Sequence, residues 1–263
     1  MKEKVEVVIA QFNSIVGDLC GNTDKIINII RENRSLDIKK IIIFPELALC
    51  GYSPEDLLLR KDFSIAVKSS IEKIKENVGS NEYLILGAPN YSEDMSEIWN
   101  SAYIMNNKKI NHIYDKQFLP NYGVFDEKRY FSKGNSNFVI DINNNKICIL
   151  VCEDLWNFQN LYEKNLEDID FLISINASPF ENTKVSKRID VFKKIVEKYN
   201  FNLIYLNSVG GQDEIVFDGS SFLMDRNSNL VHRCNTFKEE NYKFFILDKE
   251  FSNDNSYRVE TNT

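Results

Sequence analysis

Three short apolar segments of this chain each end in one reactive side chain, and this pattern constrains the fold most. The segment 41–44 leads through a proline to Glu46, the segment 110–114 leads to Lys116, and the segment 147–151 leads directly to Cys152. Runs that are apolar throughout are typical of strands buried on both faces. Ligand sites in open α/β sheets gather at the carboxyl ends of such strands. We therefore expect a base, a charge stabiliser and a nucleophile at one sheet edge, the groups needed for acyl transfer through a thioester.

The remaining apolar pattern predicts one strand-rich domain over residues 1–251, followed by a polar tail over 252–263. Further strands are expected at 5–10, 83–87, 102–105, 138–142, 171–175, 203–206, 221–224, 230–232 and 244–247. Helices are expected after an N-cap at 22–24, over 62–78 with Gly79 ending the helix, and over 184–199. Because several strands are apolar on both faces, helices should cover a stacked pair of sheets.

Composition excludes several classes of protein. The chain has 263 residues, of which 43% are hydrophobic, so it can bury a sizeable core. A net charge of −7 argues against nucleic acid or an anionic membrane as a partner. No segment approaches the ~18 apolar residues of a membrane span, and the charged N-terminus lacks the apolar region of a signal peptide. The five cysteines form no C-x-x-C pair, which indicates a reducing cytoplasm rather than disulfides or zinc.

Cys152 is the strongest candidate nucleophile. A free cysteine is more often simply a buried structural residue. However, Glu153 and Asp154 follow it directly, and two carboxylates are an unusual end for a core strand. Cys148, on the same strand, is better explained as core. Cys50 lies four residues after Glu46, and its role stays open at this point.

Glu46 and Lys116 each have an ordinary alternative, a solvated loop glutamate and a surface lysine beside Asp115. Apolar residues flank Glu46 on both sides, and burying a carboxylate without a role is costly. The chain has only two histidines, His112 and His232, which leaves little room for a Cys-His or Ser-His pair. No His, Cys and Asp grouping has metal-ligand spacing, so no metal site is expected.

The ordered motifs resemble a known family. Phe-Pro-Glu at 44–46, Lys116 with Leu-Pro at 119–120, and Cys-Glu at 152–153 resemble the Glu-Lys-Cys triad of the nitrilase (carbon–nitrogen hydrolase) superfamily. The segments 51–58, 119–122, 125–131, 176–180 and 209–220 are similar to the glutaminase domains of glutamine-dependent NAD synthetases. The resemblance implies a four-layer αββα sandwich, in which two units often pair across a helical face, and hence a homo-oligomer.

The resemblance also implies residue roles and a substrate. The substrate is L-glutamine, whose ammonia passes to a synthetase active site, and no cofactor is expected. The catalytic residues are Glu46, Lys116 and Cys152, with Glu127 as a second glutamate that braces the lysine. The glutamine-binding residues are Tyr122, Ser178 and Lys184, with Glu153 as a further contact.

One departure from this pattern is large, because the sequence holds no S-G-G-x-D-S adenylation loop of a synthetase half. The chain is therefore a truncated piece, the partner of a separate synthetase, or a free-standing amidase of the ω-amidase kind. A non-catalytic binding module of the same fold is a further alternative. Catalysis also meets an energetic gap, since a thiol pKa of ~8.5 and a glutamate pKa of ~4.3 differ by about four units, or roughly 6 kcal/mol. We expect the Lys116 ammonium to lower the pKa of Cys152 and narrow this gap.

Overall fold

The computed structural model describes residues 4–162 and 169–252, which build two large sheets. The first sheet holds, in spatial order, β15 (Glu250–Ser252), β14 (Glu240–Leu247), β1 (Val5–Gln11), β2 (Lys39–Ile43), β3 (Glu82–Tyr91), β4 (Ile98–Asn106) and β5 (Lys109–Asp115). The second holds β13 (Leu230–Arg233), β12 (Phe222–Met224), β9 (Asn202–Asn207), β8 (Phe171–Asn176), β7 (Asn145–Val151) and β6 (Val139–Ile142). A separate hairpin pairs β10 (Val209–Gln212) with β11 (Ile215–Asp218).

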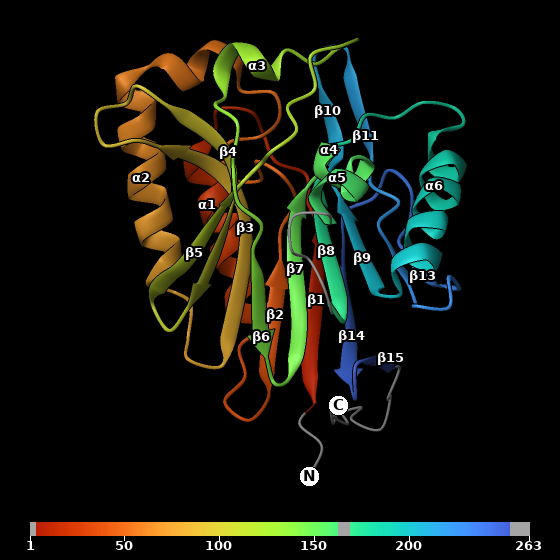
Figure 1. Cartoon of the computed structure of the whole chain (residues 1–263). Coiled ribbons are helices and arrows are strands. Elements are labelled where there is room, and N and C mark those ends of the chain that lie inside the picture. Colours follow the sequence, from red (N-terminus) through yellow and green to blue (C-terminus); the bar gives the residue numbers. More distant parts are fainter. Residues whose placement is uncertain (1–3, 163–168, 253–263) are drawn as a thin grey trace.

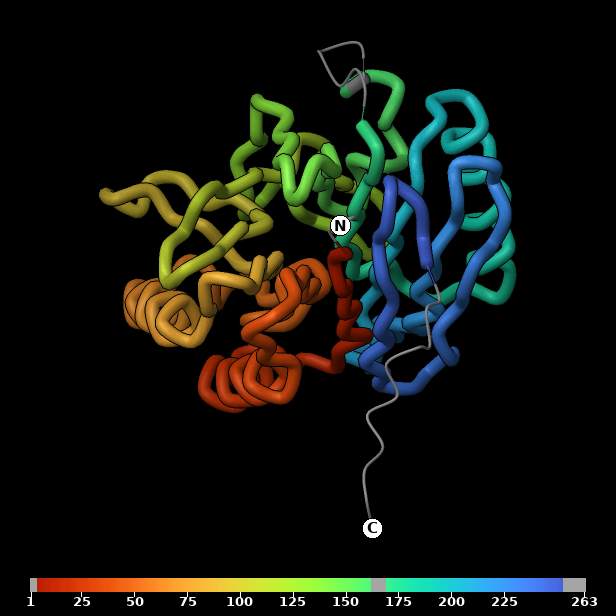
Figure 2. The backbone as a smooth tube through the Cα atoms, turned by 90° about the horizontal axis from the view of Figure 1, so that it is seen from below, coloured from red at the N-terminus to blue at the C-terminus, as the bar shows by residue number. Residues whose placement is uncertain are grey.

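Helices cover the outer face of each sheet. In Figure 1, α1 (Leu19–Glu32) and α2 (Lys61–Lys75) lie outside the first sheet, and α6 (Lys184–Tyr199) lies outside the second. Figure 2, turned by 90°, shows the same order, with the orange helices on one side and the blue-green chain on the other. The expected four-layer αββα sandwich is confirmed. The remaining helices are short: η1 (Glu55–Leu59), α3 (Glu127–Tyr130), α4 (Glu153–Trp156) and α5 (Phe158–Tyr162).

The centre of each sheet is parallel. β1 pairs in parallel with β2, and β2 with β3; in the second sheet β7, β8 and β9 are parallel in the same way. The flanking strands are antiparallel, so β5 runs in the same direction as β3. The carboxyl ends of β2, β3 and β5 therefore lie at one edge of the first sheet.

The sandwich buries apolar residues in two places. On β1, alternate residues such as Val7 and Ile9 face the core between the sheets, whereas Val8 and Ala10 belong to the core beneath α1 and α2. The side-chain period of a strand explains this division, because neighbouring residues point to opposite faces. The second sheet covers one face of β1 and the helices cover the other, which explains why its residues are apolar on both faces.

Two predicted helix boundaries are wrong. α1 begins earlier than the expected cap at 22–24, because the Asp18 carboxylate accepts a hydrogen bond from the Gly21 N–H at 2.9 Å. Asn22 lies inside the helix, where its buried amide donates to the carbonyls of Ile15 and Leu49. α2 ends at Lys75, four residues before Gly79.

The predicted tail needs one correction at its start. Ser252 is the last residue of β15, and residues 253–263 lie outside the described part of the chain. Within the described residues, no helix is long and apolar enough to cross a membrane.

Candidate active site

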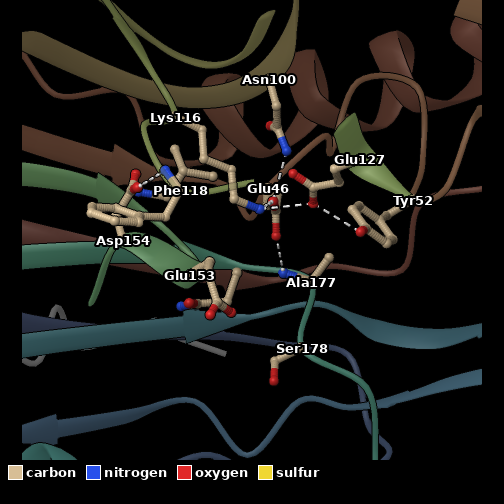
Figure 3. Close-up of polar contacts among 12 residues, drawn as sticks. Glu46, Tyr52, Asn100, Lys116, Phe118, Glu127, Glu153, Asp154, Ala177 and Ser178 are labelled. Carbon is tan, nitrogen blue, oxygen red and sulfur yellow. Dashed lines mark hydrogen bonds and ion pairs between the residues drawn. The ribbon is translucent and has the colours of Figure 1, made fainter. Parts of the chain in front are cut away.

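The structure brings Glu46, Lys116 and Glu127 into one buried cluster. The Lys116 Nζ lies 2.7 Å from Glu46 Oε1 and 2.8 Å from Glu127 Oε1. The three side chains are almost completely buried, at 1%, 0% and 4% exposure respectively. Figure 3 shows the ammonium between the two carboxylates. The convergence expected from the strand ends is therefore present for the carboxylate and the ammonium.

Three donors surround the Glu46 carboxylate. Its Oε1 accepts hydrogen bonds from Lys116 Nζ and from Asn100 Nδ2, each at 2.7 Å, and its Oε2 accepts one from the Ala177 N–H at 2.7 Å. Ala177 directly follows β8, so this last contact joins the two sheets. Sequence reasoning missed Asn100, although a polar residue inside the apolar strand 98–105 was a visible signal.

Glu127 holds the lysine from the opposite side. Its Oε1 also accepts a hydrogen bond from the Tyr52 hydroxyl at 2.9 Å, while its buried Oε2 has no partner among the described residues. Burial raises the pKa of Glu127 to about 7, against the opposing effect of Lys116. Burial alone would lower the pKa of Lys116, but the charges of Glu127 and Glu46 outweigh it and raise that pKa well above its usual value. The lysine is therefore a permanent cation.

Cys152 occupies a sharp turn between β7 and α4. Its φ of +47° is a backbone conformation that a non-glycine residue adopts only under strain, which is common at functional sites. Its N–H donates to the Ile175 carbonyl at 2.9 Å, so the turn is fixed to β8. The side chain is 5% exposed. The turn thus holds a buried thiol at the carboxyl end of its strand.

Lys116 lowers the pKa of Cys152, as expected, but this effect does not narrow the pKa gap as predicted. Burial and the negative charge of Glu46 raise the pKa of this thiol well above its usual value, and the opposing effect of Lys116 is smaller. The carboxylates neutralise much of the field that the lysine alone would exert. The resting site therefore holds a thiol, and its proton must leave as the sulfur attacks.

Two glycines allow the backbone around Glu46 and Lys116 to pack closely. A Cβ on Gly87 of β3 would lie 2.2 Å from the Pro45 carbonyl oxygen and 2.7 Å from the Glu46 Cα. A Cβ on Gly134 would lie 2.0 Å from the Asp115 carbonyl oxygen, directly before Lys116. Any larger residue at either position would displace a segment that carries a site residue.

Glu153, which directly follows Cys152, forms a hydrogen-bonded pair with Tyr122. The Tyr122 side chain is 59% exposed, and its hydroxyl donates to Glu153 Oε2 at 3.0 Å. Burial and Glu153 raise the pKa of Tyr122 to about 12, and a thiolate at Cys152 adds to the shift. These two predicted substrate residues therefore lie within electrostatic range of the thiol.

Ser178 and Lys184 approach from the β8–α6 connection. Ser178 is buried, its N–H donates to Asn207 Oδ1 at 2.8 Å, and its hydroxyl accepts a hydrogen bond from Arg188 Nη2 at 3.2 Å. Figure 3 shows Ser178 next to Ala177, beyond the oxygen of Glu46 that Ala177 contacts. Lys184 is the half-buried first residue of α6. Burial and Arg188 lower the pKa of Lys184, and a thiolate at Cys152 acts in the opposite sense.

The other cysteines and the histidines lie outside this cluster. Cys50 and Cys148 are fully buried in the two apolar cores, and burial raises the pKa of each thiol. His112 and His232 stack on aromatic rings, with centroids 3.6 and 3.5 Å apart respectively. Cys50 therefore has the environment of a core residue.

Sequence reasoning predicted no metal site and missed one grouping of possible metal ligands. His232, Cys234 and Glu240 each place a ligand atom within 4.8 Å of the others. The turn between β13 and β14 brings Glu240 to the other two, which spacing along the chain does not reveal. Glu240 Oε2 already accepts two hydrogen bonds from Asn235, at 2.9 and 3.0 Å, so the turn itself accounts for its position.

The αββα fold and the buried carboxylate, ammonium and thiol at its sheet edge define a hydrolase of the carbon–nitrogen class, and comparison with known families agrees. Residues 6–248 match the carbon–nitrogen hydrolase family, and the chain belongs to it. It is 36% identical over 238 residues to the glutamine-dependent NAD(+) synthetase of Aquifex aeolicus, covering 90% of this chain and 41% of that protein. The corresponding protein of Acinetobacter baylyi is 33% identical over 248 residues, covering 94% and 45%. The chain therefore spans less than half the length of these relatives.

Solved structures give the same assignment. Glutamine-dependent NAD+ synthetase from Acinetobacter baumannii, in complex with adenosine diphosphate, superposes with a TM-score of 0.89 at 33% identity, over 95% of this chain and 47% of that one. An amidase from Nesterenkonia sp. superposes with a TM-score of 0.79 at 16% identity, over 94% and 92%. At that identity the likeness to the amidase shows the shared fold alone.

Proposed function

We propose that this chain hydrolyses L-glutamine to L-glutamate and ammonia through a thioester on Cys152. The observation that carries the proposal is the placement of opposite charges around the thiol. The Lys184 ammonium has no hydrogen bond or ion pair within the described residues, whereas Glu153, which directly follows Cys152, is paired with Tyr122. Free glutamine carries one carboxylate and one ammonium, and both need partners once water is excluded. The names of the relatives, glutamine-dependent NAD(+) synthetases, support the same substrate.

In the proposed mechanism, Glu46 accepts the thiol proton while the Cys152 sulfur attacks the side-chain amide carbon. The Lys116 ammonium, held between two carboxylates, stabilises the oxyanion. Glu46 then returns the proton to the leaving nitrogen, so that ammonia departs and the thioester forms. Glu46 next takes a proton from the water that attacks the thioester, and it gives this proton to the sulfur as the C–S bond breaks, which releases glutamate and restores the thiol. Glu127 and Tyr52 keep the lysine in place throughout.

The ammonia needs an acceptor that the described residues do not supply. An NAD synthetase domain or subunit is the acceptor that fits the relatives, each of which is more than twice as long as the matched region. We further propose a reducing cytoplasm as the compartment, in keeping with five free cysteines. We also propose a homo-oligomer, which light scattering after gel filtration would test.

Substrate choice is tested by ammonia release from L-glutamine and from butyramide. Lys184→Ala should lose roughly 2–4 kcal/mol of kcat/KM for glutamine, because a buried substrate carboxylate is left unpaired. Butyramide has no carboxylate, so its hydrolysis should hardly change. The matched control is Lys187→Ala, which removes an exposed lysine from the same helix. Equal turnover of both amides by the wild type, unaffected by Lys184→Ala, would leave a general amidase instead.

A further inference from the structure

Asp154 lies two residues after Cys152, on α4, and its side chain is completely buried. Its Oδ1 accepts hydrogen bonds from the backbone N–H groups of Gln117 and Phe118, at 3.0 and 2.8 Å. Its Oδ2 accepts hydrogen bonds from the Tyr114 hydroxyl at 2.9 Å and from the Val151 N–H at 3.3 Å. Figure 3 shows the carboxylate against the segment of Phe118, to one side of the Lys116 ammonium.

These donors come from both sheets and surround two site residues. Tyr114, Gln117 and Phe118 lie on either side of Lys116, which follows β5 of the first sheet. Val151 directly precedes Cys152, which follows β7 of the second sheet. One carboxylate therefore fixes the backbone that carries the ammonium relative to the backbone that carries the thiol.

The buried charge of Asp154 indicates a role beyond filling space in the core. Burial raises the pKa of Asp154 to about 6, and Lys116 opposes that shift, although its ammonium forms ion pairs with Glu46 and Glu127 instead. A buried carboxylate costs free energy that an apolar side chain of similar volume would not. The carboxylate instead fixes local geometry, because its two oxygens hold three backbone N–H groups and a hydroxyl at defined positions.

We propose that Asp154 is a positioning residue for catalysis, which sets the place of Lys116 relative to the Cys152 thiol. It does not touch the reacting atoms. The inference deepens the proposed function and rests on it only for the identity of the substrate. Its consequence is that loss of the carboxylate lowers kcat, whereas glutamine affinity is nearly retained.

The test variant is Asp154→Asn. An asparagine keeps the size of the side chain but replaces one of the two oxygens by an NH₂ group. That NH₂ group would face backbone N–H groups that donate to the carboxylate, either that of Val151 on one side or those of Gln117 and Phe118 on the other. Displacement of reacting groups by about 1 Å can cost roughly 100-fold in rate. We expect a loss of that order in kcat, little change in glutamine KM, and slower alkylation of Cys152 by iodoacetamide.

The matched control is Asp170→Asn at the opposite end of β8. Asp170 is also buried, and it accepts a hydrogen bond from the Lys146 N–H at 2.9 Å, at the start of β7. This variant should lower the unfolding temperature without lowering kcat or the alkylation rate. If Asp154→Asn behaves like the control, losing stability alone, the positioning role is wrong.

A second variant covers the case in which Asp154→Asn does not fold. Tyr114→Phe removes one donor and keeps the buried ring, so it should lower kcat several-fold at unchanged KM; an unchanged kcat there would overturn the proposal. The alkylation assay also needs no substrate. If the wild type releases no ammonia from glutamine, the proposed function fails, yet Asp154-dependent alkylation of Cys152 still supports the positioning role.

Discussion

Glu46→Gln replaces the proposed base by an amide of the same shape. The carboxylate accepts three hydrogen bonds, two at Oε1 from Lys116 and Asn100 and one at Oε2 from the Ala177 N–H. A glutamine has one acceptor and one donor end. If its NH₂ group faces Ala177, two buried N–H groups are left unpaired, that of Ala177 and the amide N–H facing it; if the amide is flipped, both donors at Oε1 lose their acceptor as well.

The cheaper orientation sets the expected cost in stability. Each unsatisfied buried donor costs about 1–3 kcal/mol, so the two together cost about 2–6 kcal/mol. For a domain of this size each kcal/mol corresponds to roughly 2–4 °C in unfolding temperature, so we expect a fall of about 4–24 °C. The cost in rate is larger, because loss of a positioned general base lowers the rate by about 10²–10⁴-fold. Lys116 keeps its second carboxylate, Glu127, and so stays charged.

The assay combines ammonia release, alkylation of Cys152 by iodoacetamide and thermal unfolding. The matched control is Glu82→Gln, at the start of β3, where a buried carboxylate accepts a hydrogen bond from the Gly79 N–H at 2.6 Å. The control should lose stability and keep activity. Glu46→Gln should lose activity and react more slowly with iodoacetamide. Equal alkylation rates in Glu46→Gln and the wild type would remove Glu46 from its role as base.

Two further predictions concern the thiol and the second glutamate. Cys152→Ala should abolish ammonia release and leave the fold intact, whereas Cys148→Ala should lower the unfolding temperature and keep activity; the reverse pattern would move the nucleophile. Burial raises the pKa of Glu127 to about 7, whereas a glutamate in the unfolded chain has a pKa of ~4.3. Between these two pH values the folded protein holds a proton that the unfolded chain has released. The contribution of the protonated Glu127 to the free energy of unfolding is therefore lost as the pH rises through about 7. Glu127→Gln should therefore show a smaller fall in unfolding free energy between about pH 5 and pH 8 in urea titrations, and an unchanged fall would contradict this.

The layers of the fold could be predicted from the sequence, because strands buried on both faces are rich in apolar residues without alternation. Residues 147–151 are apolar throughout, residues 171–175 are apolar except for Ser174, and both segments are strands covered on two faces. The start of α1 could not be predicted in this way. The helix cap was expected within residues 22–24, but the Asn22 amide lies inside α1 and donates to the carbonyls of Ile15 and Leu49, contacts that only the tertiary structure creates.

The site was predictable where strand ends point to it. Glu46, Lys116 and Cys152 each follow an apolar run, the first two at strand ends of the first sheet and Cys152 at the end of β7 in the second sheet. The residues that orient them were not predictable in this way, because Asn100 and Tyr52 reach their carboxylates across 54 and 75 positions of the chain. The raised pKa of Cys152 was also out of reach, since it depends on how burial and Glu46 outweigh Lys116 in three dimensions.

The most direct test of the central claim is labelling of the intact protein with a diazoketone analogue of L-glutamine, followed by peptide mass spectrometry. This electrophile needs both the glutamine site and the activated thiol. The account predicts a single label on Cys152, slowed by L-glutamine and unaffected by butyramide at the same concentration. Label on another cysteine, or labelling of Cys152 that L-glutamine does not slow, would contradict it.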